Sequence, residues 1–466
     1  MLKPAITMAV MVTLSACAVG PDYRQPQANT EATFTAANTA SFNSSPVTPQ
    51  FWNSFNDATL AQLVNDALLA NHDLRIALAN LNASRAIHRL SRFDLAPTVT
   101  AGAGYTEQLY AKGLNSTREV SYYDASIDAV WELDVFGRAR RNLERSRAEV
   151  QAAEANLQDA QVMVTAEVTR TYFELRGQQQ QLSVARRNVQ NQGETVDLTR
   201  VRLDAGRATE LDTSRAQALL SSSNATIAPL QAAVARSIHR LSVLTGRGPN
   251  ALTELLTPSA ELPVLPEVVA VSDPATLLRQ RPDIRVAERE LAASTAAIGV
   301  AVADLFPRVT FTGSVGVAAI NSSGLGDAGS GTRLVAPGIS WAAFDLGRVK
   351  AQIAATRFNN QASLAHYEQT VLQALEETEN ALVTHAQARE RLQYLTESAA
   401  ASSRAAELAR IRYENGVIDF LQVLDAERSL LQAEDQLAQS RTETATSLVA
   451  VYKALGGGWA DAPLPR

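Results

Sequence analysis

The sequence of this chain repeats itself once, at a constant spacing of 210 residues. The paired positions are Asp73-Leu74-Arg75 with Asp283-Ile284-Arg285, Pro97-Thr98-Val99-Thr100 with Pro307-Arg308-Val309-Thr310, Trp131 with Trp341, Gly137-Arg138 with Gly347-Arg348, Arg202 with Arg412, and Gly206 with Gly416. No net insertion separates these pairs, so both halves are expected to fold in the same way. The spacing is far longer than the roughly 20–50 residues of a solenoid unit. It predicts an internal two-fold repeat of one large module.

The first residues read as a targeting segment. Lys3 precedes the apolar run Ala5–Leu14, and Leu14-Ser15-Ala16-Cys17 resembles a bacterial lipobox. This predicts a signal peptide cleaved after residue 16, a covalent lipid on Cys17, and a lipid-anchored segment over residues 17–56. Cys17 is the only cysteine, so it has no disulfide partner within the chain. An ordinary signal peptide with an incidental cysteine is the alternative. Ala18 stands where an Asp would resemble an inner-membrane retention signal, which favours the outer membrane.

Two stretches alternate between apolar and small polar residues. The first hairpin is expected at about 97–133 and the second at about 307–344, with strands of about ten residues, near the length of a tilted membrane strand. One face carries the apolar side chains and the other carries Gly, Ser, Thr and Asp, the pattern of a wet-lumen membrane barrel. A soluble two-sided sheet is the alternative.

Four such strands cannot span a bilayer alone, because their open edges would leave backbone groups unsatisfied in hydrocarbon. Two chains would supply about eight strands and a filled barrel, whereas three would supply about twelve and leave a lumen. The small residues on the polar face favour the homotrimer.

Helical lengths indicate a second tube. No proline occurs from Arg138 to about Ala205, so roughly 65 residues can form one helix of about 100 Å. A shorter helix is expected at about 208–244, and its missing length reappears at about 273–304. The second half repeats the scheme at 348–413 and 417–455, completed by residues 58–95. A hollow bundle is favoured over a solid coiled coil, because the helices continue from strands arranged around a lumen. The expected segments are repeat 1 at 57–246, an equatorial linker at 247–273, repeat 2 at 274–456 and a tail at 457–466.

No residues suggest reaction chemistry. The net charge of −6 gives no basic stripe for nucleic acid. The five histidines form no metal-ligand pattern, and neither a nucleophile motif nor a phosphate loop is apparent: His72, His88, His239, His366 and His385. The chain is therefore predicted to be no enzyme and to hold no metal and no cofactor other than the lipid.

Several short motifs, taken in order, resemble the TolC/OprM family, in particular its lipidated NodT-type subgroup. They are Cys17-Ala18-Val19-Gly20-Pro21-Asp22-Tyr23, Arg281-Pro282-Asp283-Ile284, Phe306-Pro307, Phe344-Asp345-Leu346-Gly347-Arg348, Asn415-Gly416, Leu424-Asp425-Ala426 and Ala454-Leu455-Gly456-Gly457-Gly458-Trp459. The resemblance implies an α+β membrane protein. In this fold a trimeric twelve-stranded transmembrane β-barrel continues into a twelve-helix periplasmic α-barrel, with a mixed equatorial domain.

The resemblance also implies a function and partners. The expected role is passive export of drugs or other small toxic compounds across the outer membrane, powered by an inner-membrane transporter of the resistance-nodulation-division (RND) class. A periplasmic adaptor would join the two. The outer channel of a type I protein secretion system and a non-pore coiled-coil lipoprotein are the alternatives; the lipobox and the terminal Gly-Gly-Gly-Trp argue against the first of them.

The resemblance places a periplasmic gate just after the second helix–helix turn. Gly206 and Gly416 mark the two turns, and Leu421, Asp425 and Arg428 match the constricting positions, at i, i+4 and i+7 on one helix face. Tyr413 and Asp212 match a latch hydrogen bond, but Ile418 stands where the latch has an arginine. Gln422 stands where the family has a first constricting Asp, which favours a gate with a single ring of Asp. The alternatives are that Asp425 is an ordinary solvated helix residue and that Tyr413 serves packing.

Overall fold

The computed structural model describes residues 18–26, 33–35, 42–43, 50–111, 119–271 and 273–459. The predicted signal peptide, Cys17 and the last seven residues of the tail lie outside them. The chain divides into two compact units. Unit 1 comprises Met1–Ala28, Ala79–Ala155 and Arg285–Thr370, and unit 2 comprises Asn29–Leu78, Asn156–Ile284 and Val371–Arg466.

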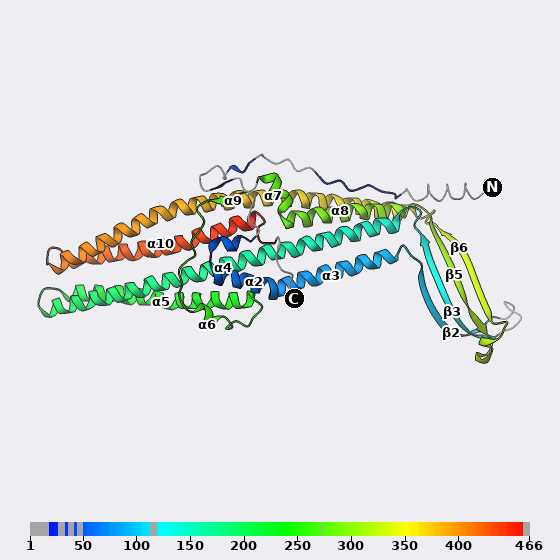
Figure 1. The fold of residues 1–466 in the computed structure, drawn as a ribbon, viewed down its shortest axis with the longest axis horizontal. Helices are drawn as coiled ribbons and strands as arrows, with labels where there is room; N and C mark the ends of the chain where they lie inside the picture. Colours follow the sequence, from blue (N-terminus) through cyan, green and yellow to red (C-terminus); the bar gives the residue numbers. More distant parts are fainter. Residues whose placement is uncertain are drawn as a thin grey trace. The chain divides into compact units, whose positions relative to one another are not determined.

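Unit 1 contains a four-stranded antiparallel sheet in the order β2-β3-β5-β6 (Figure 1). Its strands are β2 (Thr98–Leu109), β3 (Glu119–Leu133), β5 (Arg308–Ala319) and β6 (Gly331–Ser340). The central pairing of β3 with β5 joins the hairpin of the first half to that of the second, and it sets Ile127 opposite Val315. Within the described residues, β2 and β6 each pair along one side only.

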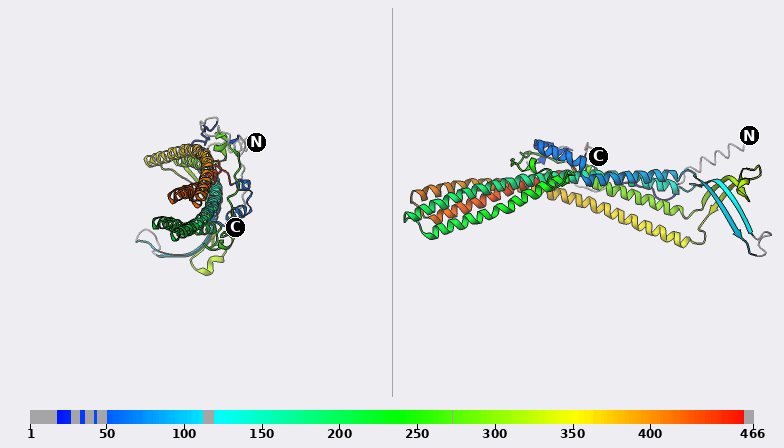
Figure 2. Two further views of the ribbon diagram at one scale, coloured as in Figure 1. Left: turned by 90° about the vertical axis from the view of Figure 1, so that its left-hand side faces the viewer. Right: turned by 90° about the horizontal axis from the view of Figure 1, so that it is seen from below.

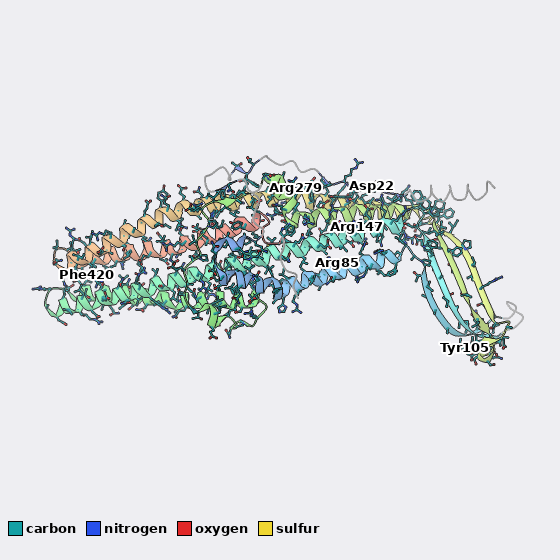
Figure 3. The ribbon with its side chains drawn as sticks, in the orientation of Figure 1. Asp22, Arg85, Tyr105, Arg147, Arg279 and Phe420 are labelled. Carbon is teal, nitrogen blue, oxygen red and sulfur yellow. The ribbon has the colours of Figure 1, made fainter. Side chains whose placement is uncertain are left out.

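The sheet leaves large apolar side chains uncovered in the single chain. Val99 is 62% exposed, Val315 is 61% exposed and Ile339 is 75% exposed. Tyr105, labelled on β2 in Figure 3, lies in the same exposed row. Most alternate residues are small or polar, although Val130 and Leu334 also lie on that face. There the Ser126 hydroxyl donates to the Asp128 carboxylate at 2.8 Å. The uncovered apolar row requires lipid or another protein surface.

Aromatic residues mark the strand ends where the helices begin. The Trp131 indole donates to Leu95 O at 3.1 Å, and the Trp341 indole repeats this bond to Leu305 O at 2.9 Å. Both bonded pairs are related by the 210-residue spacing. Amphipathic rings of this kind suit a membrane–water interface.

Long helices account for most of the remaining chain. α4 (Arg138–Asp204) has 67 residues and α9 (Leu346–Glu414) has 69. α5 (Glu210–Leu244) and α10 (Phe420–Ala454) have 35 each, and their bounds differ by 210 residues. The same difference relates α3 (His72–Phe93) to α8 (Pro282–Ala303), and β2 to β5. None of the helices in the described part is both long and apolar enough to cross a membrane.

Two of the predicted helices are interrupted. The stretch expected to run through residues 60–93 is divided into α2 (Ala58–Ala70) and α3 by Asn71, and the stretch at 273–304 into α7 (Pro274–Gln280) and α8 by Arg281. Both residues are extended, with ψ of 134° and 122°. Pro282 disfavours a helical residue before it. Asn71 instead accepts from the Asp73 N–H at 2.8 Å, as an N-cap does.

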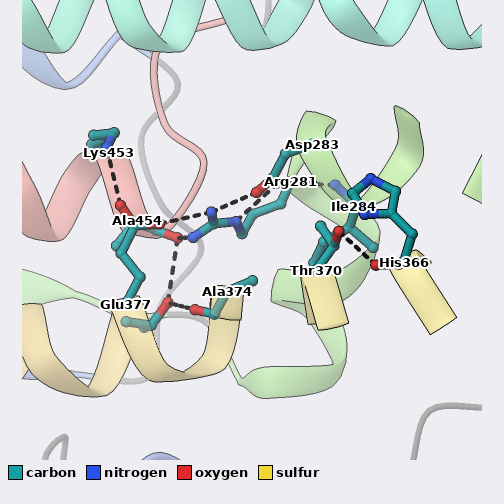
Figure 4. A network of polar contacts seen from close by, with 10 residues as sticks. Arg281, Asp283, Ile284, His366, Thr370, Ala374, Glu377, Lys453 and Ala454 are labelled. Carbon is teal, nitrogen blue, oxygen red and sulfur yellow. Dashed lines mark hydrogen bonds and ion pairs between the residues drawn. The ribbon is translucent and has the colours of Figure 1, made fainter. Parts of the chain in front are cut away.

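The two interrupting residues make equivalent contacts in unit 2. The Asn71 amide donates to Leu244 O at 2.9 Å, and the Arg281 guanidinium donates to Ala454 O at 2.8 Å. Leu244 and Ala454 are the last residues of α5 and α10, so their carbonyl oxygens need a hydrogen-bond donor from outside the helix. Arg281 also binds Glu377 at 2.8 Å, and Glu377 binds Lys453 at 3.0 Å (Figure 4). The start of α8, the middle of α9 and the end of α10 are thereby tied together.

A cluster of aromatic residues lies in the core of unit 2. The Phe51 ring stacks on Tyr452 at 4.8 Å, and Phe55 meets Phe173 edge-on at 4.9 Å. Phe51 belongs to the 3-10 helix η2 (Phe51–Phe55), so the segment before the first repeat packs against α4 and α10. The short elements β1 (Phe42–Asn43) and β4 (Val269–Ala270) pair in parallel, which brings in the linker that also contains α6 (Thr253–Leu256). The rings of Phe51, Phe55, Phe173 and Tyr452 thus form part of the core of unit 2.

The four helices α9, α10, α4 and α5 of unit 2 follow one another along a curved row (Figures 1 and 2). Side-chain bonds join α4 to α10, with Arg187 on Glu434 at 2.8 Å and Thr195 on Glu427 at 2.8 Å. A curved row of helices is the arrangement expected of a segment of a hollow wall rather than a solid bundle.

His385 of α9 is buried in unit 2, where the Ser447 hydroxyl and the Thr444 backbone are its polar neighbours. It is 1% exposed, its Nδ1 lies 3.0 Å from the Ser447 hydroxyl, and its Nε2 has no partner among the described residues. Burial, with the charge of Arg389 acting in the same direction, lowers the pKa of His385 to about 4.

We expect His385 to make unit 2 sensitive to acid. The unfolded chain takes up a proton on His385 below about pH 6.5 and the folded chain only below about pH 4, so stability is full above pH 6.5 and is lost as the pH falls to 4. The linked loss is about 3 kcal/mol. Denaturant unfolding at pH 7 and pH 4 should show His385→Gln losing less stability than the wild type by about that amount. Equal losses would contradict this reading.

Candidate functional site at the helical tips

Each helical hairpin of unit 2 turns at a glycine. Gly206 has a φ of 68° and Gly416 has a φ of 72°, the left-handed conformation that ends many helices. The Gly206 N–H donates to Leu203 O at 2.9 Å, and the Gly416 N–H donates to Tyr413 O at 2.9 Å. Thr209 and Asp419 then cap the following helices. The predicted turn glycines therefore lie at the two tips and have the geometry that only glycine adopts without strain.

An apolar cluster holds the two tips of one chain together. We call it the tip cluster; it consists of Val196, Ala216, Leu219, Tyr413, Phe420, Val423 and Leu424. Its members come from α4, α5, α9 and α10, so it joins the hairpin of the first half to that of the second. Phe420, labelled at the end of the second hairpin in Figure 3, is 3% exposed.

The predicted gate residues lie in the first turns of α10, on the face that points away from the tip cluster. Leu421 is 54% exposed, and Asp425 and Arg428 are also exposed, whereas Val423 and Leu424 face the tip cluster. No ion pair joins Asp425 to Arg428 in the part of the chain that the structure describes. The single chain thus presents an apolar side chain, a carboxylate and a guanidinium in one free row along α10.

Tyr413 and Asp212, the candidate latch, have other partners in the single chain. The Tyr413 ring is buried, 5.6 Å from the Phe420 ring, and its hydroxyl has no hydrogen-bond partner among the described residues. Burial raises the pKa of Tyr413. Asp212 accepts from the N–H and hydroxyl of Thr209, at 3.0 and 2.8 Å, as part of a capping box. Within one chain, Tyr413 packs and Asp212 caps.

One contact at the tips was not predicted. Arg202 of α4 donates to Tyr413 O at 2.7 Å and to Glu414 O at 2.8 Å, and its guanidinium lies 4.1 Å from the centre of the Tyr413 ring. The sequence carried a signal for it, because Arg202 and Arg412 are one of the pairs that the repeat conserves within this chain. What that arginine binds could not be inferred from spacing.

The residues after Cys17 are packed on unit 1, although Cys17 itself lies outside the described residues. Val19 N–H donates to Phe136 O at 3.1 Å, and Arg141 binds Val19 O at 3.1 Å and Asp22 at 2.7 Å. Gly20 has a φ of 94°, and a Cβ there would meet Gly299 Cα at 2.4 Å. Because Phe136 follows the end of β3, the residues beside Cys17 lie next to the end of the sheet.

Comparison with known proteins agrees with these features. The model of the outer membrane efflux protein family matches residues 63–247 and again residues 274–457. The efflux pump outer membrane protein TtgC of Pseudomonas putida, itself described as probable, is 32% identical over 469 residues, which cover 98% of this chain and 96% of the relative. OprJ of Pseudomonas aeruginosa is 32% identical over 467 residues, with 98% and 97% covered.

Solved structures extend the likeness to the fold. The outer-membrane channel OprN has a TM-score of 0.90 at 44% identity, covering 95% of this chain and 100% of that one. The open state of MtrE from Neisseria gonorrhoeae has a TM-score of 0.84 at 30% identity, with 95% and 99% covered.

A sheet with an uncovered apolar face, followed by helices of nearly seventy residues, therefore defines an outer-membrane channel component with a TolC-like helical extension. The chain belongs to the outer membrane efflux protein family. The resemblance to the TolC/OprM family, inferred from the motifs, is confirmed. The protein is located in the outer membrane. The family comprises efflux ducts rather than enzymes.

Neighbouring residues at the tip should respond differently to truncation. Phe420→Ala removes a buried ring from the tip cluster and should lower the free energy of unfolding by about 3 kcal/mol. Leu421→Ala removes an exposed side chain and should change it by less than about 0.5 kcal/mol. Denaturant unfolding of both variants checks this, and similar losses would mean that Leu421 is packed rather than free.

Proposed function

We propose that this chain forms the exit duct of a tripartite efflux system of the RND class, through which drugs or other small toxic compounds leave the periplasm passively. The observation that carries the proposal is the sheet of unit 1. Its apolar row is exposed, and its outer strands β2 and β6 are paired on one side only. In hydrocarbon such a sheet is stable only when its edges meet strands of other copies.

Closure by three copies accounts for the features of both units. About twelve strands would surround a lumen lined by the Ser and Asp side chains of the polar face. The paired helices would form a twelve-helix tunnel, with the aromatic core, the N-terminal segment and the linker as an equatorial belt around it. The matching element bounds support two copies of one module in each chain, so a trimer would have six modules around its axis.

The relatives indicate the kind of cargo and partners. Among them are an antibiotic efflux pump outer membrane protein and a toluene efflux pump outer membrane protein of Pseudomonas putida, each 32% identical to this chain. Small apolar or amphipathic toxic compounds are therefore the cargo we propose. An inner-membrane RND transporter would supply the energy, and a periplasmic adaptor would contact the tips at Gly206 and Gly416, where the backbone is open to a partner.

The free row on α10 would act as the gate. Around a threefold axis, Leu421 of each copy would form an apolar collar, and Asp425 would bring three carboxylates near one another. Arg428 lies one turn further on the same face and would moderate their repulsion. Such a closed state would have a population that adaptor contacts can shift. For the latch, Tyr413 retains an unpartnered hydroxyl that could bind a neighbouring copy, whereas Asp212 would first have to leave its cap.

Recording from a planar lipid bilayer tests the duct and its gate together. The wild type should give stepwise conductance, and Asp425→Ala should raise it severalfold and weaken closure by cations, because the carboxylates leave the constriction. Asp425→Asn separates charge from size, and Asp435→Ala, further along α10, should behave as the wild type. A silent bilayer would contradict the duct, and unchanged currents in Asp425→Ala would contradict the gate.

Cys17 is proposed as the acylated residue, since the residues after it are held at the end of the sheet. Cys17→Ser should abolish incorporation of radiolabelled palmitate while leaving channel assembly, because the contacts of Val19 and Asp22 with unit 1 remain. Labelling and native electrophoresis of the membrane fraction measure both. A labelled Cys17→Ser protein would show that the lipid is attached elsewhere.

A further inference from the structure

The seam between the two hairpins of one chain is well supplied with contacts. Besides the tip cluster, it contains the pairs Arg187–Glu434 at 2.8 Å and Arg410–Glu194 at 3.0 Å. We call it the within-chain seam; it is formed chiefly by α4 on one side and by α10 with the end of α9 on the other. At its tip, Arg202 binds the last carbonyls of α9, which have no partner inside their own helix.

The two tips have the same backbone geometry. α4 ends at Asp204 and α9 at Glu414, 210 residues later. The bond from Arg207 N–H to Arg202 O is 2.8 Å, and its counterpart from Val417 N–H to Arg412 O is 2.9 Å. Arg412 therefore holds on the second hairpin the position that Arg202 holds on the first, yet its side chain is exposed.

The proposed ring of three copies, on which this inference rests, contains two kinds of seam. If the step from the first hairpin to the second is repeated around the axis, the second hairpin of one copy meets the first hairpin of the next in the same way. The last carbonyls of α4, at Leu203 and Asp204, correspond to those of Tyr413 and Glu414. We propose that Arg412 of each copy donates to Leu203 O and Asp204 O of the neighbouring copy.

The seam between copies differs in composition from the within-chain seam. Leu203 corresponds to Tyr413 and is the one large apolar side chain among the residues equivalent to the tip cluster. The others are small or polar: Glu210 for Phe420, Thr213 for Val423, Ser214 for Leu424, Ser429 for Leu219, Ala406 for Val196 and Ala426 for Ala216. The ion pair of Glu194 with Arg410 corresponds to Arg404 beside Arg200, which are like charges. Without an apolar cluster or this ion pair, the seam between copies depends on the Arg412 clasp.

The difference between the two seams implies that the tip opens at the seam between copies. The tip cluster supports the within-chain seam, whereas release of the Arg412 clasp would loosen the seam between copies. Arg202 makes the same bonds to carbonyls, but the seam that it closes has other contacts to hold it.

Paired arginine variants test the clasp. In bilayer recordings, Arg412→Ala should raise the conductance of the closed state severalfold, whereas Arg202→Ala should change it much less because the tip cluster remains. Arg412→Lys keeps a donor and should lie between Arg412→Ala and the wild type, since Lys cannot bind two carbonyls in a fixed fork. Arg412→Ala equal to the wild type, or Arg202→Ala with an equal effect, would overturn the proposal.

Cysteine pairs test the seam independently of the clasp residues. Asn224→Cys with Glu397→Cys corresponds to the Arg187–Glu434 pair and should be joined between chains by a short bismaleimide, which gives covalent dimers and trimers on a denaturing gel. Arg187→Cys with Glu434→Cys should be joined within a chain, with no change in mass. Sedimentation of the unmodified protein distinguishes a failure of the proposed trimer from a failure of the proposed contact between copies. A monomer would remove the proposed duct, whereas a trimer without the Asn224–Glu397 link would remove this inference alone.

Discussion

Backbone hydrogen bonding at the edges of the sheet constrains the whole molecule. Among the residues that the structure describes, β2 and β6 are paired on one side only, and the row of Val99, Ile127, Val315 and Ile339 is uncovered. In hydrocarbon each unpaired amide or carbonyl costs several kcal/mol, about as much as a domain can lose without unfolding. The isolated chain is therefore an incomplete structure in a membrane. α4 and α9 start a few residues after β3 and β6, so each long helix continues the chain from the sheet.

Stabilising contacts are distributed unequally along unit 2. The aromatic residues around Phe51, Phe173 and Tyr452 pack in its core, and Arg281 ties three helices together beside it. At the tips, the buried apolar contacts are those of the tip cluster. Leu421, Asp425 and Arg428 lie exposed on the other face of α10. A protein whose core is rigid and whose ends have few apolar contacts can open at the ends without unfolding elsewhere.

Departures from the repeat identify where the halves have separate tasks. Asn71 and Arg281 occupy equivalent positions and donate to the last carbonyls of α5 and α10. Replacing an amide by a guanidinium changes the strength of this hydrogen bond but leaves its role the same. Glu210 and Phe420 differ in kind, since one is a charged exposed residue and the other fills the tip cluster. The two halves of a duplicated chain can therefore have different contacts at equivalent positions.

The sequence by itself determined the periodic features: the repeat, the two hairpins, the helix lengths and the turn glycines, because each depends on local spacing or on a backbone conformation that one residue type favours. The resemblance proposed Leu421, Asp425 and Arg428 as a gate, and their i, i+4 and i+7 spacing predicts only that they share a helix face. The tertiary structure decided which partners those residues have. Several observed contacts join residues that are far apart in the chain: the bonds of Asn71 and Arg281 to the ends of α5 and α10, the aromatic core, the packing of Tyr413, and the bonds of Arg202 to Tyr413 O and Glu414 O. Their contacts depend on how helices meet, and a single helix's periodicity does not contain that information.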